Sequence, residues 1–326
     1  MENKDLPKIS IMIPTYNQEL YIDEAIKSAL AQDYDNLEVV VSDDCSTDNT
    51  ELVVQKYLSD ARVKYFKNEK NLGRVGNYRK TLYDYATGEW VVNLDGDDYY
   101  IDSHFVSYIA ELISKYKSED IVVLWISEPG YDKSVKVFKD CIVEKDVLLL
   151  NGIRYFQKYP KVGIFAHYNF IYNRNLALKT DFYSFNSLNS DFHSGIRLIL
   201  RGNMLLINRS VAYWRMHENN ASLTDYSTKL TQSIDALKSI YLDAQSFLSP
   251  KDAKSWFLKM ERLEKQSFTV SIACQEEGLT SFLFVLFHPV FTKTYLILSV
   301  KMLIRTLGIK SKYAIPNRMH KTKELK

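Results

Sequence analysis

The first hundred residues alternate short apolar runs with segments whose apolar residues recur at helical spacing. The apolar runs have the length of buried strands, and they are Ile9–Ile13, Leu37–Val41, Arg62–Phe66 and Trp90–Leu94. Helical spacing occurs between them, in Tyr21–Gln32, in a segment from about Asp48 to Tyr57, and in Val75–Tyr85. Repeated β-α units of this kind predict an α/β fold, with a mainly parallel sheet covered by helices on both faces.

Beyond residue 100 the pattern is less regular. It predicts a helix over Ser103–Ile113, a strand over Ile121–Ile126, and pairing of Lys136–Phe138 beside that strand. Residues 221–278 are predicted to form two helices, and the second begins at Ser249-Pro250 because proline is favoured at the first helical position. The apolar stripe of this second helix is expected to pack on the main domain, and it consists of Trp256, Met260 and Leu263.

Polar clusters follow three of the predicted strands. They are Pro14-Thr15-Tyr16-Asn17, Asp43-Asp44 and Asp95-Gly96-Asp97-Asp98. The carboxyl ends of parallel strands meet at one edge of a sheet, and ligands bind beyond that edge. We therefore expect the three clusters to lie together and to form a binding site.

The most acidic of these clusters places three carboxylates within four residues. Like charges this close raise one another's pKa unless a cation or hydrogen-bond donors lie among them. We expect Gly96 to allow a sharp turn that brings Asp95 and Asp97 together. Oxygen ligands of this kind suit Mg²⁺ or Mn²⁺, and Mg²⁺ commonly shares its shell with substrate phosphates. An ordinary Asp/Gly turn leaving a strand explains these residues equally well when they are taken alone.

Composition narrows the class of protein further. Of the 326 residues, 46% are hydrophobic and 25% charged, as in an ordinary globular protein, and the net charge of +2 gives no reason to expect nucleic acid as a partner. Cys45, Cys141 and Cys274 are widely spaced, so they indicate neither a disulfide framework nor a zinc site and fit a reducing cytoplasm. The polar N-terminus predicts no signal peptide.

Glycine-rich phosphate-binding motifs are missing from the sequence. Neither G-x-G-x-x-G after the first strand nor G-x-x-x-x-G-K-[ST] occurs, and these glycines let a backbone approach phosphate closely. An acidic edge repels phosphate unless a divalent cation bridges the two. A nucleotide diphosphate held through a metal is therefore the simplest expectation.

Several motifs, in their order and spacing, resemble those of the family-2 glycosyltransferases, which are inverting enzymes of the glycosyltransferase-A fold that use nucleotide-activated sugars. The resemblance covers about residues 8–220 and rests on Ser10-Ile11-Met12-Ile13-Pro14-Thr15-Tyr16-Asn17, Val41-Ser42-Asp43-Asp44-Cys45-Ser46-Thr47-Asp48, Asn71-Leu72-Gly73, Ala86-Thr87-Gly88-Glu89 and Leu94-Asp95-Gly96-Asp97-Asp98. It implies a glycosyltransferase-A type fold, a mainly parallel Rossmann-like sheet flanked by helices, here with an added C-terminal helical region.

The resemblance also implies roles for the edge residues. The loop from Pro14 to Tyr16 is expected to lie against the nucleobase, and Asp44 to hydrogen-bond that base. The D-x-D motif of Asp95 and Asp97 is expected to handle the ribose, the metal and the diphosphate.

Asp98 and Cys45 also lie within these motifs. Asp98 can serve as a metal ligand or as a support for its loop, and the sequence leaves both open. Cys45 departs from the family, whose members often have glycine there, and we expect no loss of function from this difference.

A further carboxylate is the expected general base. By resemblance this is Asp191, in Leu188-Asn189-Ser190-Asp191-Phe192-His193, which precedes a helical pattern. Asp191 could instead be the N-cap of that helix. His193 is a second, weaker candidate for the base.

The segment Tyr213-Trp214-Arg215-Met216-His217 matches the R-x-H ending of the family. The match implies that His217 contacts the metal or the diphosphate, and that Arg215 is a charge partner for phosphate. A lone histidine is more often structural, so the metal role of His217 depends on its context.

From Leu279 onward the chain becomes apolar and then basic. The apolar runs Phe282–Phe287 and Tyr295–Val300 are interrupted by His288-Pro289, and residues 301–326 contain eight Lys and Arg against one acid, Glu324. The interruptions argue against a transmembrane span. They favour helices lying in the inner leaflet, with basic residues on anionic lipid. The alternative is a tail packed on the domain or in a dimer, so a homo-oligomer stays open.

The sequence thus predicts four parts: a nucleotide-sugar-binding half (1–100), an acceptor-binding half of the same catalytic domain (101–220), a helical extension (221–278) and a membrane-associating tail (279–326). We expect a metal-dependent inverting glycosyltransferase, cytoplasmic and peripheral on the inner face of the cell membrane. It would move a sugar from a nucleotide diphosphate, with UDP expected, to a hydroxyl of a glycan or lipid-linked acceptor in surface polysaccharide synthesis.

Two other functions compete with this expectation. A sugar nucleotidyltransferase needs a basic, glycine-rich loop near the N-terminus, and Ile13-Pro14-Thr15-Tyr16 is not one. A non-catalytic, membrane-bound glycan-binding module would have no need to retain the acidic and histidine positions of the site.

Overall fold

The structure is a computed structural model that describes residues 6–126, 134–162, 169–187, 189–215, 217 and 229–275. The chain forms two compact units, of which the larger contains Met1–Thr224 and Thr231–Met260. The smaller unit contains Asp225–Leu230 and Glu261–Lys326. Every site residue described below belongs to the larger unit.

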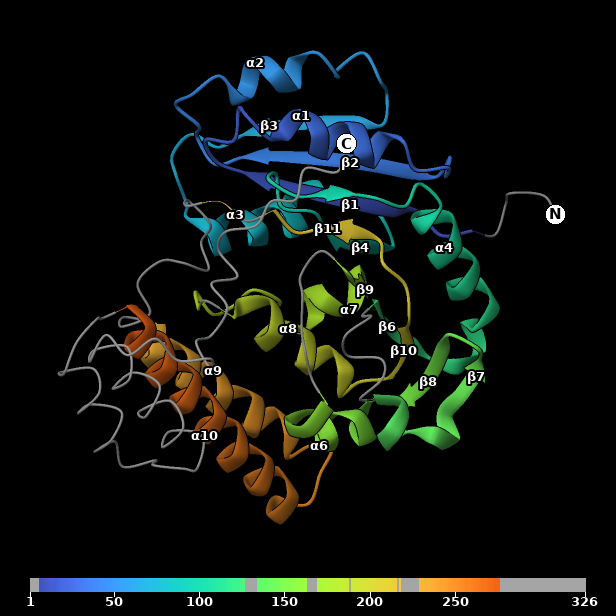
Figure 1. Cartoon of the computed structure of the whole chain (residues 1–326), viewed down its shortest axis with the longest axis vertical. Helices are drawn as coiled ribbons and strands as arrows, with labels where there is room; N and C mark the ends of the chain where they lie inside the picture. Colours follow the sequence, from blue (N-terminus) through green and yellow to red (C-terminus); the bar gives the residue numbers. More distant parts are fainter. Residues whose placement is uncertain are drawn as a thin grey trace, which may run out of the picture. The chain divides into compact units, whose positions relative to one another are not determined.

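The larger unit is built on a nine-stranded sheet with the order β3-β2-β1-β4-β9-β6-β10-β8-β7 among the described residues (Figure 1). Its strands are β1 (Ile9–Thr15), β2 (Leu37–Asp43), β3 (Val63–Lys67), β4 (Trp90–Asn93), β6 (Ile121–Ile126), β7 (Ile142–Glu144), β8 (Val147–Asn151), β9 (Phe170–Asn173) and β10 (Asn203–Ile207). A separate two-stranded ribbon pairs β5 (Tyr99–Tyr100) with β11 (Ala212–Tyr213).

The four strands of the first hundred residues are parallel to one another, as predicted. β1 pairs with both β2 and β4, and β2 pairs with β3. The remainder of the sheet is mixed, because β9 runs antiparallel between β4 and β6, and β8 and β7 run antiparallel at the far edge. All residues of β1 and β2 are buried, which is expected of strands covered on both faces.

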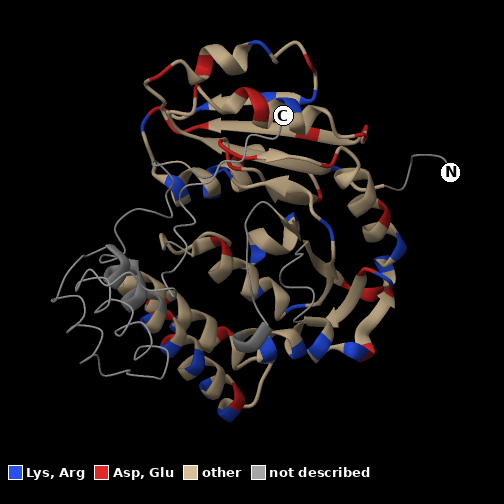
Figure 2. Cartoon of the chain, viewed as in Figure 1, with Lys and Arg blue, Asp and Glu red and all other residues tan. Residues whose placement is uncertain are grey.

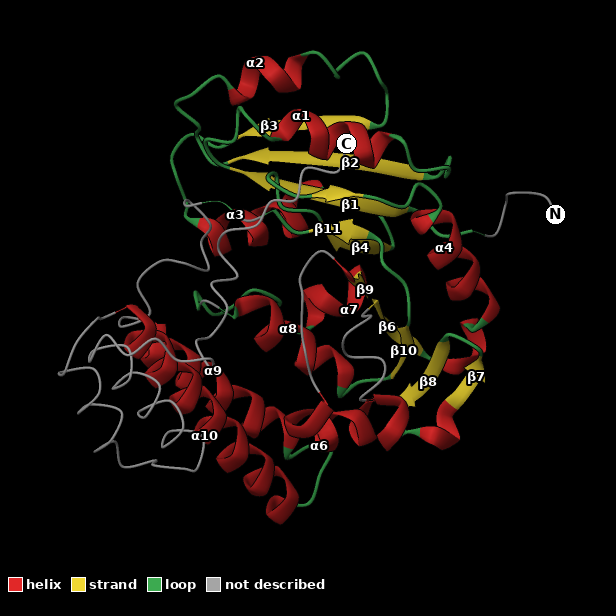
Figure 3. Ribbon diagram, viewed as in Figure 1, coloured by secondary structure: helices red, strands yellow, loops and turns green. Residues whose placement is uncertain are grey.

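Helices cover both faces of the sheet (Figure 3). The helices of the described residues are α1 (Ile22–Leu30), α2 (Thr50–Gln55), α3 (Arg74–Lys80) with its π-helical continuation (Thr81–Tyr85), α4 (Phe105–Lys115), α6 (Gly152–Val162), α7 (Arg174–Lys179), α8 (Ser190–Ile199), α9 (Lys229–Ala244) and α10 (Pro250–Gln275). Two short 3₁₀ turns occur at Lys117–Glu119 and Lys139–Cys141.

Alternation along the strands divides the core into two clusters. In β1, Ile11 and Ile13 pack in the cluster that includes α1 and α4, whereas Met12 packs in the cluster that includes α3 and α8. This period of two is the signature of a strand. Each face of the central sheet therefore packs against its own cluster, and this packing fixes the strand ends from which the loops of the carboxyl edge begin.

One prediction beyond residue 100 needs correction. Lys136–Phe138 does not pair as a strand: residues 134–137 are helical, and the Phe138 amide donates to the Ser134 carbonyl at 2.8 Å. The strands at this edge are β7 and β8, a few residues further along the chain.

The helix predicted to start at Ser249-Pro250 is confirmed as α10, with Pro250 as its first residue. Of its expected apolar stripe, Trp256 and Met260 are buried, and the Trp256 ring stacks on Phe156 at 4.2 Å. Leu263 is 41% exposed and does not share this packing.

The membrane-associating tail predicted for residues 279–326 lies outside the described residues. Within the part of the chain that the structure does describe, no helix is both long enough and apolar enough to cross a membrane.

Candidate active site

The three polar clusters meet at the carboxyl edge of the sheet, as predicted. Thr15 at the end of β1 pairs with Asp43 at the end of β2, and β4 lies on the other side of β1, where Met12 pairs with Asn93. In Figure 2 acidic positions lie beyond the arrowheads of β1 and β2, while most of the strands carry no charge. The edge can therefore bind a ligand that carries a cation or hydrogen-bond donors.

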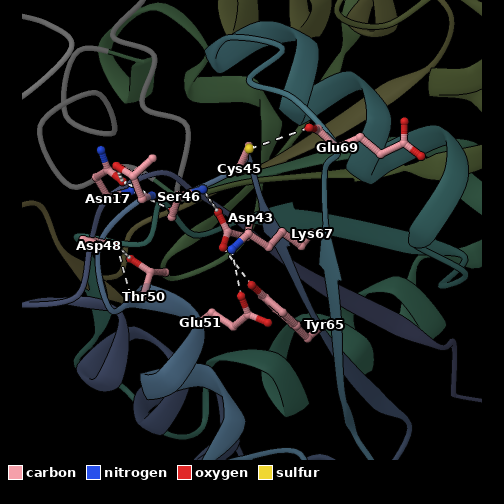
Figure 4. Close-up of polar contacts among 11 residues, drawn as sticks. Asn17, Asp43, Cys45, Ser46, Asp48, Thr50, Glu51, Tyr65, Lys67 and Glu69 are labelled. Carbon is pink, nitrogen blue, oxygen red and sulfur yellow. Dashed lines mark hydrogen bonds and ion pairs between the residues drawn. The ribbon is translucent and has the colours of Figure 1, made fainter.

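The loops after β1 and β2 are joined by hydrogen bonds (Figure 4). The Asn17 amide donates to Ser46 Oγ at 2.9 Å, and the Thr47 amide donates to Asn17 Oδ1 at 2.8 Å. Buried Asp43 accepts from the Ser46 amide at 2.7 Å and from the Tyr65 hydroxyl at 2.7 Å. Asp43 therefore supports the edge and does not face a ligand.

Asp44 is held with one oxygen fixed and the other available. Its Oδ1 accepts from Asn68 Nδ2 at 2.9 Å and from the Leu72 amide at 2.8 Å. Asn77 in turn accepts from Asn68 Nδ2 at 3.0 Å and from Ser42 Oγ at 2.7 Å. No described residue donates to Asp44 Oδ2, so this oxygen can accept a hydrogen bond from a ligand.

The loop expected to lie against the nucleobase begins inside β1. Pro14 pairs with Ser42 in the sheet and is buried, whereas Tyr16 follows the strand and its side chain is 46% exposed. The exposed Tyr16 ring is free to cover a flat ligand.

Asp95 is oriented by a residue that sequence reasoning missed. The hydroxyl of buried Tyr78 on α3 donates to Asp95 Oδ1 at 2.7 Å. A Cβ atom at Gly96 would lie 2.2 Å from Gln18 Oε1 and 2.9 Å from Thr15 Oγ1, so any other residue here would displace the Gln18 and Thr15 side chains. The φ of Gly96 is not among the positive ones, so the expected sharp turn does not depend on a left-handed conformation.

Asp97 and His217 form a close pair. Asp97 Oδ2 lies 2.9 Å from His217 Nε2, and their side chains are 13% and 15% exposed. Burial and the charge of Asp95 raise the pKa of Asp97, although the hydrogen bond with His217 opposes the increase. The His217 ring stacks on Tyr21 at 4.9 Å, so α1 helps to place it.

Asp98 supports the segment that carries His217. Its Oδ1 accepts a hydrogen bond from the Arg215 amide at 2.9 Å. Burial and the nearby charge of Asp95 raise the pKa of Asp98 to about 8. Of the two roles left open for Asp98, this contact favours loop support.

Arg215 has a different partner from the predicted phosphate. Its guanidinium forms an ion pair with Glu24 of α1. It also lies over the rings of Tyr21 and Tyr99, at 4.9 and 5.3 Å from their centres. A phosphate contact would require this guanidinium to leave Glu24.

Asp191 is the second residue of α8, so it is not the N-cap of that helix. The N-cap position belongs to Asn189, whose side chain makes no capping hydrogen bond. Asp191 is partly exposed, as a proton acceptor must be.

His193 is poorly suited to act as the base. It is 1% exposed, and its Nδ1 lies 2.7 Å from Ser187 Oγ. Burial lowers the pKa of His193 to about 3. This histidine is therefore a neutral core residue.

The protein supplies only part of a metal site. Among the described residues, no group of three or more His, Cys, Asp or Glu side chains is arranged to hold a metal ion. The pair of Asp97 and His217 offers a carboxylate oxygen and an imidazole nitrogen, and burial together with the charge of Asp95 raises the pKa of that carboxyl. This donor set fits a divalent cation whose remaining ligands come from water and a diphosphate.

Solved structures define the class to which this fold and edge belong. The N-terminal region of TarS from Staphylococcus aureus, solved in complex with UDP-GlcNAc, superimposes with a TM-score of 0.63 over 92% of this chain and 81% of that one, at 21% identity. The mannosyltransferase PcManGT from Pyrobaculum calidifontis, solved with GDP-Man and Mn²⁺, gives 0.55 over 94% and 88%, at 17% identity. The fold is that of the glycosyltransferase-A class, as predicted.

The particular family follows from the sequence profile named Glycosyl transferase family 2, which matches residues 10–180. The chain belongs to this family. It is 38% identical over 143 residues to the GalNAc(5)-diNAcBac-PP-undecaprenol beta-1,3-glucosyltransferase of Campylobacter jejuni, covering 43% of this chain and 40% of that protein. It is 36% identical over 147 residues to the poly(ribitol-phosphate) beta-N-acetylglucosaminyltransferase TarS, covering 44% and 25%. The matched region thus spans less than half the length of either relative.

Proposed function

We propose that the protein transfers a sugar from a nucleotide diphosphate sugar, with UDP as the nucleotide, to a hydroxyl of a glycan or lipid-linked acceptor in surface polysaccharide synthesis. The observation that carries this proposal is the meeting of Asp44, Asp95 and Asp97 at one edge of a family-2 fold. The relatives support the substrate class, because one is named for an undecaprenol-linked acceptor and the other for a poly(ribitol-phosphate) acceptor.

The donor is assigned to the edge formed by β1, β2 and β4. Pro14 and Tyr16 border the base, and Asp44 Oδ2 accepts a hydrogen bond from it. Asp95, fixed by Tyr78, faces the ribose and diphosphate. Arg215 is assigned as the charge partner of the phosphate. Its guanidinium leaves Glu24 and pairs with the phosphate when the donor binds.

Asp191 is assigned as the general base. Its carboxylate takes the proton of the acceptor hydroxyl while that oxygen attacks the anomeric carbon of the donor sugar. The bond from that carbon to the diphosphate oxygen breaks on the opposite face, so the configuration inverts and a nucleoside diphosphate leaves.

Asp97 and His217 are assigned as ligands of Mn²⁺ or Mg²⁺. When bound, the cation offsets negative charge on the departing diphosphate. The solved structures of PcManGT and of GalNAc-T7 were obtained with Mn²⁺, which supports this assignment.

The protein is further proposed to act in the cytoplasm, at the inner face of the membrane. The basic residues of 301–326 would bind anionic lipid and bring the site to lipid-linked acceptors. A homo-oligomer is compatible with this arrangement.

A panel of sugar nucleotides tests the proposed function. One UDP-sugar should raise the melting temperature in the presence of Mn²⁺, lose this effect in EDTA, and release UDP when an acceptor glycolipid is added. Formation of pyrophosphate and a sugar nucleotide from a sugar phosphate would identify a nucleotidyltransferase instead. Glycan binding without turnover of any sugar nucleotide would identify a binding module.

A further inference from the structure

Arg74 begins α3 and lies beside the residue that orients Asp95. Arg74 and Tyr78 are four residues apart and therefore share one face of the helix. The Arg74 guanidinium lies 5.5 Å from the centre of the Tyr78 ring, and the Tyr78 hydroxyl donates to Asp95 at 2.7 Å. Arg74 is thus placed next to the donor carboxylate.

The same guanidinium reaches toward the proposed base. Arg74 Nη2 donates to the Ser187 carbonyl at 3.0 Å, and Ser187 lies three residues before α8, the helix that carries Asp191. A single side chain therefore connects an element of the first hundred residues to the acceptor-side segment, 113 positions away.

The charges around Arg74 favour this bridging position. Burial by itself lowers the pKa of a guanidinium, yet the pKa of Arg74 is raised, because the electrostatic influence of Tyr78, Asp191 and Asp95 outweighs the effect of burial. Two carboxylates that must lie close to one reacting centre repel each other, and a fixed cation between them offsets that repulsion.

We propose that Arg74 is a positioning residue that holds the donor carboxylate Asp95 and the base Asp191 in fixed relation, so that acceptor and donor meet in line. This inference rests on the proposed transferase function. A guanidinium suits the task because its planar set of donors can address a carbonyl and neighbouring carboxylates at the same time. Positioning of this kind contributes most in the transition state, since small displacements of reacting groups cost much rate.

Arg79 lies five residues after Arg74 in the same helix, α3, and is a matched control. Arg79 Nη1 donates to the Phe182 carbonyl at 2.9 Å, and Arg79 also pairs with Asp181 at 2.7 Å. Arg79 therefore ties α3 to the same segment without contacting Asp95 or Asp191. A purely structural role for Arg74 would make the two arginines equivalent.

The test compares Arg74→Gln, Arg74→Lys and Arg79→Gln in the full-length protein. Because both arginines tie α3 to this segment, we expect both Gln variants to lower the melting temperature. Arg74→Gln should in addition lower kcat by at least about tenfold while the Kd for UDP changes less than about threefold. Arg74→Lys should recover part of kcat, and Arg79→Gln should keep the wild-type value. Equal kcat for the two Gln variants would overturn the proposal, as would a loss confined to UDP affinity.

A second measurement does not depend on turnover. In a double-mutant cycle of urea unfolding, the effects of Arg74→Gln and Asp191→Asn should be non-additive, whereas those of Arg79→Gln and Asp191→Asn should add. Additivity in both cycles would overturn the placement of Arg74 beside Asp191 even if the protein transferred no sugar. Absence of transfer by the wild type would count against the proposed function alone.

Discussion

At the scale of single residues, the backbone conformation of Cys45 shows the consequence of its departure from the family motifs. Cys45 has a φ of 65°, and Asn17 in the adjoining loop has a φ of 52°. This left-handed region favours glycine, which is the residue that the family resemblance leads us to expect at the position of Cys45. The sequence showed the departure, but only the structure shows that it places strain beside Asp44.

Replacing Cys45 with glycine should therefore stabilise the protein. A left-handed conformation destabilises a non-glycine residue by about 1–2 kcal/mol. The greater conformational freedom of glycine in the unfolded chain offsets about 0.5–1 kcal/mol of the stability gained by the substitution. We expect Cys45→Gly to raise the free energy of unfolding by up to about 1 kcal/mol, as measured by urea denaturation. Cys45→Ala removes the thiol but keeps the strain, so it should not reproduce the gain.

His193 gives a residue-scale prediction about pH. Its pKa is lowered to about 3 in the folded protein, so between about pH 6.5 and pH 3 the unfolded chain binds a proton that the folded protein does not. Stability contributed by neutral His193 is therefore present above pH 6.5 and is lost as the pH falls toward 3. Lowering the pH from 7 to 5 should cost about 2 kcal/mol through this group.

His193→Gln should remove this part of the acid sensitivity, measured as the difference in unfolding free energy between pH 7 and pH 5. An acid sensitivity that is the same in wild type and His193→Gln would show that His193 titrates normally.

At the scale of elements, a column of stacked planar groups joins three segments beside the acidic edge. His217 stacks on Tyr21, Arg215 lies between Tyr21 and Tyr99, and Tyr99 stacks on Tyr213 at 5.2 Å. The family resemblance predicted roles for Arg215 and His217 but could not show this column, because its members come from the N-cap of α1, from β5, and from β11 and the residues after it.

Tyr21 is central to this column, and its loss should loosen His217. Ring stacking and cation–π contacts are each worth about 0.5–1.5 kcal/mol, so Tyr21→Ala should weaken Mn²⁺-dependent UDP binding by up to about tenfold in calorimetry. Tyr21→Phe keeps the ring and should bind as the wild type does. An unchanged UDP affinity of Tyr21→Ala would show that the stacked column does not contribute to metal-dependent binding.

At the scale of the whole molecule, local patterns predicted more than long-range pairing did. Alternating apolar runs were enough to place β1 to β4 and their loops, since each β-α unit is encoded within about thirty residues. The insertion of β9 between β4 and β6 joins residues about eighty positions apart on the β4 side and more than forty apart on the β6 side, so no local pattern indicates it. Arg74 was missed for the same reason, because Ser187 lies 113 positions away. Tyr78 is only 17 positions from Asp95, but no motif of the sequence links the two residues.

The basic tail belongs to this scale as well. If residues 279–326 bind anionic lipid, the full chain should sediment with anionic liposomes and be released by high salt. A shortened chain ending at Gly278 should stay in the supernatant and keep its affinity for UDP-sugar. Equal sedimentation of both chains would contradict lipid binding by the tail and favour its packing on protein.

The most direct test of the account is the rate of sugar transfer by Asp191→Asn. The proposed base lies on α8 and the proposed donor residues lie on the loops after β1, β2 and β4, so the substitution should change turnover and not donor binding. With the cognate UDP-sugar, Mn²⁺ and acceptor, kcat should fall by about 10²–10⁴-fold while the Kd for UDP stays within about twofold of the wild type. Because Asn189 and not Asp191 occupies the N-cap, loss of a helix cap cannot explain such a fall. Transfer by Asp191→Asn at the wild-type rate would contradict the account, since no base would then act from this position.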